Sequence, residues 1–116
     1  MAIRGIRGAT TVKNNSRKEI LDSTREMLSA LARANRFKTA DIASVIFTVT
    51  CDLSAEFPAV AARQMGWSET PLLCTNEIPV PGSLPKCIRV LIHLNTAKKQ
   101  SAIKHIYLKE AKSLRR

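Results

Sequence analysis

The chain has 116 residues, of which 45% are apolar and 24% charged, a composition that fits one globular domain over residues 1–116. The formal net charge is +10, so nucleic acid, a membrane surface or an anionic metabolite are the partners that the charge favours. No segment is apolar for long enough to cross a membrane, and the first residues are glycines and arginines where a signal peptide would be apolar. We therefore expect a cytoplasmic protein.

Metal ligands are few and scattered in this sequence. Cys51, Cys74 and Cys87 form no CxxC pair, and the only two histidines, His93 and His105, stand apart from other ligands. An odd number of widely spaced cysteines also argues against a disulfide framework. The sequence therefore predicts no metal site and no cofactor.

Residues 3–12 are predicted to form a strand that carries an arginine. Side chains alternate across a strand, so Arg7 shares a face with Ile3, Gly5 and Ala9. A cation among apolar and small neighbours is costly unless an anion meets it. We expect Arg7 to occupy a place that belongs to the core and to face an anion there.

A long helix is predicted to begin after Ser16 and to end near Asn35. Ser16 and Glu19 form a capping box, in which the glutamate reaches back to the Ser16 amide. A mainly apolar stripe then recurs at helical spacing, formed by Ile20, Thr24, Met27, Leu31 and Ala34 and widened by Leu21 and Leu28. This face is better explained by core packing than by a partner.

The middle of the chain is predicted to hold a strand, a short helix and another strand. β-branched and apolar residues alternate over 43–50, which is typical of a strand. Pro58 suits the first turn of a helix that Gly66 ends. Residues 67–74 are predicted to form another strand, the third of the chain, which Pro71 weakens.

The last third is predicted to carry a strand with a second arginine. Residues 78–85 hold three prolines and a glycine and are expected to form a loop. In the strand 87–94, the residues at even positions are apolar and Arg89 lies on the opposite face, while residues 106–108 add a short edge strand. Strands separated by one long and one short helix predict a mixed sheet, and two strand-borne arginines favour a rigid pocket for a small anion.

Three further residues are candidates for chemistry. Glu77 follows the third strand and can pair with an arginine or accept a hydroxyl proton, although a surface glutamate is the simpler interpretation. Cys74 has no neighbouring histidine to activate it, which favours an inert cysteine. Tyr107 fits an ordinary packed tyrosine as well as a hydroxyl that meets a carboxylate. No catalytic triad is present, so an enzyme of this sequence would work by positioning and charge.

Five segments together resemble one family. They are residues 3–12 (IRGIRGATTV), 57–59 (FPA), 86–90 (KCIRV), 105–108 (HIYL) and 114–115 (LR). In order and spacing they are similar to the trimeric, α/β-barrel-type monofunctional chorismate mutases, and not to the all-helical class with the same activity. The resemblance implies an α+β homotrimer with a mixed β-sheet, one long helix and one short helix.

The resemblance also implies an activity and a set of site residues. The chain would isomerise chorismate to prephenate by a cofactor-free [3,3] rearrangement, in phenylalanine and tyrosine biosynthesis. The implied catalytic residues are Arg89, which serves the ether oxygen and a carboxylate, with Arg7 and Glu77. The implied substrate-binding residues are Arg7, Leu73, Cys74, Thr75, Asn76, Glu77, Arg89 and Tyr107. A neighbouring subunit would supply Phe57, Ala59, Arg63, Leu114 and Arg115.

Two positions depart from the family pattern, and two other functions stay open. Val60 stands where relatives often carry lysine, and Leu73 stands where they often carry threonine. A trimer of the same fold could bind a dicarboxylate without catalysis. A basic protein could instead bind nucleic acid, but aromatic residues amount to only 4%, and RNA binding favours stacking aromatics.

Overall fold

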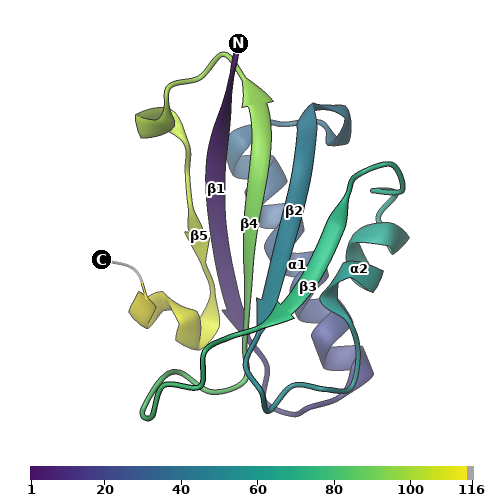
Figure 1. Ribbon diagram of the computed structural model, residues 1–116, viewed down its shortest axis with the longest axis vertical. Helices are drawn as coiled ribbons and strands as arrows, with labels where there is room; N and C mark the ends of the chain where they lie inside the picture. The colour runs from purple at the N-terminus through teal and green to yellow at the C-terminus, as the bar shows by residue number, and fades with distance from the viewer. Residues whose placement is uncertain (115–116) are drawn as a thin grey trace.

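A sheet of five strands and the helices on one of its faces make up two layers (Figure 1). The computed structural model describes residues 1–114. The strands are β1 (Ala2–Thr11), β2 (Ile42–Val49), β3 (Leu72–Asn76), β4 (Cys87–Thr96) and β5 (Ile106–Tyr107). The α-helices are α1 (Arg17–Asn35) and α2 (Pro58–Gln64), and 3-10 turns cover Thr39–Asp41, Gln100–Ala102 and Lys109–Leu114.

The sheet is mixed, as the sequence predicts. Its strand order is β3-β2-β4-β1-β5. β4 runs antiparallel to both β1 and β2, whereas β3 is parallel to β2 and β5 is parallel to β1. Parallel neighbours need a crossover connection, and α2 lies in the one between β2 and β3. The prediction of an α+β domain with one long and one short helix is confirmed.

The start of α1 follows the prediction except for one contact of the cap. Ser16 is the N-cap, and its hydroxyl accepts a hydrogen bond of 3.2 Å from the Glu19 amide. The Glu19 carboxylate does not bind the Ser16 amide, because that amide donates to the carbonyl of Asn14. Instead it accepts from the amides of Lys13 and Asn14 at 3.2 and 3.1 Å. The glutamate thus fixes the turn between β1 and α1.

The end of α2 explains why the third strand begins later than predicted. Gly66 has a φ of +94° and is flanked by hydrogen bonds from its own amide to Arg63 O and from the Trp67 amide to Ala62 O. This is a Schellman motif, which needs a residue with positive φ. Trp67 then turns into the core, where its ring packs edge-on against the ring of Phe37, with 6.2 Å between the ring centroids. The predicted strand over 67–74 is therefore wrong in its first half, and β3 begins only after Pro71.

The core lies between the sheet and the helices. It contains the predicted α1 face, Val45 and Phe47 of β2, and the even positions of β4, so the alternation predicted for β4 is confirmed. In β1 the core side is the one of Ile6 and Gly8, and Arg7 is exposed on the opposite face. The expected core environment of Arg7 is thus wrong in the single chain. Within residues 1–114, no helix has both the length and the apolar character of a membrane span.

Candidate active site

The candidate side chains gather on the face of the sheet opposite α1 and α2, which we call the front face. Strand register places them there. Arg7 of β1 pairs with Leu91 of β4, and Ala9 pairs with Arg89. Arg7 and Arg89 are therefore diagonal neighbours on antiparallel strands, a relationship that separates residues by about 7–8 Å. Two cations next to each other repel unless an anion lies between them.

One row of partners crosses the front face at Arg89. Tyr107 of β5 pairs with Ala9 of β1, Ala9 pairs with Arg89, and Arg89 pairs with Thr48 of β2. Ala9 has a small side chain, so space is left between the larger residues on either side of it. The row therefore sets a tyrosine and an arginine on two sides of one depression.

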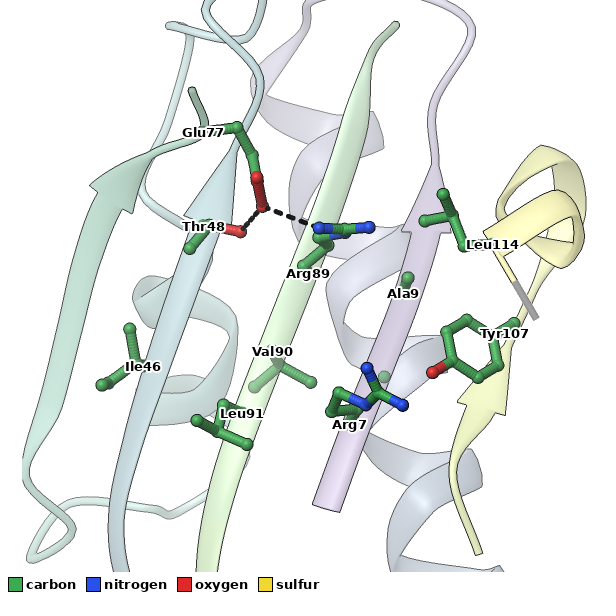
Figure 2. Close-up of a pocket in the computed structure, with 11 residues that line it drawn as sticks. Arg7, Ala9, Ile46, Thr48, Glu77, Arg89, Val90, Leu91, Tyr107 and Leu114 are labelled. Atoms are coloured by element: carbon green, nitrogen blue, oxygen red, sulfur yellow. Dashed lines mark hydrogen bonds and ion pairs between the residues drawn. The ribbon is translucent and has the colours of Figure 1, made fainter. Parts of the chain in front are cut away.

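The depression is a cavity of about 250 Å³. In Figure 2 the Arg7 guanidinium and the Tyr107 hydroxyl point toward each other at one end of it. Arg89 and Glu77 lie at the other end, and Leu114 lies on the β5 side. The lining residues are Arg7, Gly8, Ala9, Ile46, Thr48, Glu77, Arg89, Val90, Leu91, Tyr107 and Leu114.

Arg89 makes a loose ion pair inside the cavity. Its Nη1 lies 3.5 Å from Glu77 Oε1, with side chains that are 45% and 24% exposed. An exposed pair of this length contributes at most about 1 kcal/mol. It engages one nitrogen of a guanidinium that has five N–H donors. Arg89 can therefore bind an anionic ligand without losing a strong partner.

The loop-to-strand segment before Tyr107 is held to β1 by side chains. The Arg7 amide donates to Nδ1 of His105 at 2.9 Å, and the Gln100 amide group bonds both the N–H and the carbonyl of Gly5. Beyond this segment β5 pairs directly with β1, with Gly8 opposite Ile106. Burial, and secondarily the Arg7 cation, lower the pKa of His105, so the neutral ring that can accept this bond is favoured.

The structure brings together four of the residues expected to bind substrate and leaves the other four apart. Arg7, Glu77, Arg89 and Tyr107 line one cavity. The remaining four lie on β3, the strand farthest from β5 in the sheet: Leu73, Cys74, Thr75 and Asn76. None of these four lines the cavity of the single chain, although Leu73 and Thr75 pair with Ile46 and Thr48 of its wall.

The residues expected from a neighbouring subunit fall into the same two places. Phe57 is 65% exposed beside α2, and Arg63 is also exposed, whereas Ala59 is buried. Leu114 differs from the expectation, because it lines the cavity of its own chain. The turn that carries it is fixed to β1 by a bond from the Glu110 amide to the Thr11 hydroxyl. Arg115 lies outside the described residues.

Cys74 and Cys87 are poor nucleophiles and poor ligands. Burial raises the pKa of Cys87 to about 11 and also raises that of Cys74, so both thiols are protonated near neutral pH. Among residues 1–114, no three His, Cys, Asp or Glu side chains gather as a metal site would need. The chemistry available in the cavity is that of two guanidiniums, a carboxylate and two hydroxyls.

Two residues of the site were missed by sequence reasoning. Thr48 lines the cavity, and the signal for it was present, because it alternates with buried residues on β2 and therefore faces forward. His105 accepts a hydrogen bond from the Arg7 backbone amide. Its place two residues before Tyr107 was visible, but its acceptor role depends on a long-range contact that no local pattern reveals.

A comparison with known families decides the relationship of this chain. The family model for chorismate mutase type I matches residues 3–116. The chain belongs to the type I chorismate mutase family. The match includes every strand of the sheet and both arginines of the cavity.

Individual members of the type I family are similar over almost the whole chain. The chorismate mutase AroH of Thermus thermophilus is 50% identical over 114 residues, which are 97% of this chain and 93% of that protein. The AroH of Bacillus subtilis strain 168 is 42% identical over 116 residues, covering 99% and 91%. A solved chorismate mutase from Clostridium thermocellum superposes with a TM-score of 0.93 at 56% identity, covering 94% of this chain and 97% of that one.

Proposed function

We propose that the chain isomerises chorismate to prephenate by a concerted [3,3] rearrangement and serves phenylalanine and tyrosine biosynthesis. Membership of the type I family supports the reaction. The structural observation that carries it is that Arg7 and Arg89 line one cavity together with Tyr107 and Glu77. Chorismate has two carboxylates, an ether oxygen and a ring hydroxyl, and this set of groups can bind each of them.

The rearrangement needs charge stabilisation more than proton transfer. The carbon–oxygen bond breaks ahead of carbon–carbon bond formation, so negative charge grows on the ether oxygen. A guanidinium at that oxygen stabilises the transition state more than the substrate, which raises kcat. We assign this role to Arg89, whose planar group can also bind a carboxylate. The loose pair with Glu77 leaves most of its donors available.

The other cavity residues bind and orient the substrate. Arg7 and Tyr107 point toward each other (Figure 2), and we assign both to one carboxylate. Glu77 accepts a hydrogen bond from the ring hydroxyl. Holding chorismate in its reactive, folded shape lowers the entropic part of the barrier. No cofactor takes part in this mechanism.

We further propose that the site is completed in a homotrimer. The cavity opens on the front face, and three of the residues expected from a neighbour, Phe57, Ala59 and Arg63, lie at or on α2, which packs beside the β3 edge of the sheet. Phe57 and Leu73 are 65% and 61% exposed there, so this edge offers two large apolar side chains that a partner can cover. A head-to-tail contact that joins this edge to the β5 edge of the next copy can close into a ring.

In such a ring, each cavity receives a wall from the neighbour. The wall consists of Phe57 and Arg63 with Leu73 and the residues after it on β3. Burial raises the pKa of the Cys74 thiol there, and the Ala59 backbone and the Arg63 cation offset part of this rise. We assign Leu114 to the cavity of its own chain. Three unpaired cysteines agree with a cytoplasmic location, which remains our prediction.

The decisive experiment follows the loss of chorismate absorbance with purified protein, together with the mass of the protein in solution. We expect turnover to prephenate and a mass of three chains. Binding of chorismate without turnover would favour the dicarboxylate-binding alternative. Affinity for nucleic acid that falls steeply with salt, without turnover, would favour the basic nucleic-acid-binding alternative.

A further inference from the structure

We propose that Thr48 is a positioning residue that keeps Glu77 from neutralising Arg89. This inference rests on the proposed function. The Thr48 hydroxyl donates to Glu77 Oε1 at 2.5 Å, while Arg89 Nη1 lies 3.5 Å from the same oxygen. The hydroxyl is therefore the closer partner of the carboxylate, and the guanidinium is the more distant one.

The geometry of the strands makes Thr48 suitable for this task. Thr48 pairs directly with Arg89 in the register of β2 and β4, so its hydroxyl stands beside the base of the arginine side chain. The Glu77 amide is bound to the carbonyl of Val49 at 2.9 Å, which anchors the glutamate backbone next to the end of β2. From this anchor, the flexible Glu77 side chain can reach either the hydroxyl or the guanidinium.

Without the hydroxyl, a tighter ion pair would form. Carboxylate and guanidinium groups prefer bidentate contacts of about 2.7–2.9 Å, shorter than the 3.5 Å that the structure has. Such a contact would place a fixed negative charge on the group that must meet developing negative charge in the transition state. A bidentate contact would also occupy both oxygens of Glu77, whereas the bond from Thr48 occupies Oε1 and leaves Oε2 for the substrate hydroxyl. Thr48 prevents both effects by holding Oε1 on the β2 side of the cavity.

The test replaces Thr48 by valine, which keeps the β-branched shape and removes the donor. We expect Thr48→Val to lower kcat about tenfold, the order of one hydrogen bond, with a smaller change in KM. Thr48→Ser keeps the hydroxyl and should stay within about twofold of the wild type. The matched control is Ser44→Ala, which removes another β2 front-face hydroxyl, bound to His93 Nδ1 at 2.9 Å outside the cavity, and should leave kcat unchanged.

A double-mutant cycle with Glu77→Gln separates positioning from general loss of structure. A neutral amide cannot neutralise Arg89, so Thr48→Val should cost little in the Glu77→Gln background. An equal loss in both backgrounds, or a Thr48→Ser variant as impaired as Thr48→Val, would overturn the proposal.

A crystal structure of Thr48→Val gives a readout that does not depend on turnover. The distance from Arg89 Nη1 to Glu77 Oε1 should fall below the 3.5 Å of the present structure, and an unchanged distance would contradict the proposal. Lack of turnover in the wild type would instead refute the proposed function, while the distance in the Thr48→Val structure would still test the positioning role of Thr48.

Discussion

The backbone amide of Arg7 donates a hydrogen bond of 2.9 Å to Nδ1 of His105. The contact joins β1 at the residue that carries one cavity arginine to the segment that leads into Tyr107. Tyr107 then pairs with Ala9 on the same strand. Arg7 and Tyr107 point toward each other in the cavity (Figure 2), and His105 helps to fix the distance between their strands.

The bond between Arg7 and His105 predicts a pH dependence. Nδ1 can accept only while it carries no proton, and the pKa of His105 is lowered by burial and by the Arg7 cation. The unfolded chain therefore takes up a proton before the folded one. The stabilisation is complete above the ordinary pKa of 6.5 and is lost as the pH falls below it toward the folded value. Urea unfolding at a series of pH values between 8 and 5 measures this loss in the free energy of unfolding.

A His105→Asn variant is the control for this pH effect. The asparagine oxygen can accept from the Arg7 amide at the position of Nδ1, but it does not titrate. We expect the difference in unfolding free energy between the wild type and His105→Asn to change as the pH drops below 6.5, and KM of the wild type to rise over the same range. A difference that is constant with pH would contradict the role of His105.

Substitution of Arg89 should affect kcat far more than stability. Arg89→Ala removes the preorganised cation, and the loss of one such donor lowers kcat by about 100- to 1,000-fold. Arg89→Lys should also be poor, because a point charge cannot serve an ether oxygen and a carboxylate with fixed geometry. Steady-state kinetics on chorismate measure both. Full retention of kcat in Arg89→Ala would refute the role of this residue.

Local patterns in the sequence predicted the elements and the faces of the central strands. The alternation in β4 put Arg89 opposite the buried residues, and Ser16, Pro58 and Gly66 marked helix ends that the structure confirms. These features depend on neighbours within a few residues, such as a capping hydroxyl or a positive φ. That is why they could be predicted from the chain alone.

The features that failed depend on contacts between distant segments. Alternation assigned Arg7 to one side of β1 but could not say which side the helices cover, so its core environment was wrong. The sequence places Leu73 through Glu77 together, yet in the single chain only Glu77 lines the cavity, because its carboxylate extends over β2 to Thr48. The strand order that decides this is a property of the whole sheet. Contact of the other four residues with substrate stays a prediction.

The cysteines should differ in their reactivity toward alkylating reagents. Cys51 is exposed and Cys87 is buried, and burial raises the pKa of Cys87 to about 11. Because the thiolate is the reactive form, iodoacetamide at pH 8 should label Cys51 in the native protein and leave Cys87 unmodified. Mass spectrometry of tryptic peptides measures the labelling, and denatured protein should be labelled at all three cysteines. Equal labelling of Cys51 and Cys87 in the native state would contradict the burial of Cys87.

Gly8 of β1 faces the side chains of Met27 and Leu31 on α1, and adding a single methyl group there should destabilise the fold. A Cβ atom at Gly8 would lie 2.7 Å from Leu31 Cδ1 and 3.1 Å from Val90 Cγ1, so core side chains must move. Such overpacking costs about 1–3 kcal/mol. Gly5, on the front face of the same strand, is the matched control, because its Cβ would lie 3.7 Å from Leu91 Cδ1. Urea unfolding should show a loss for Gly8→Ala and a free energy for Gly5→Ala within about 1 kcal/mol of the wild type. Equal losses would mean that close packing of α1 does not explain the glycine at position 8.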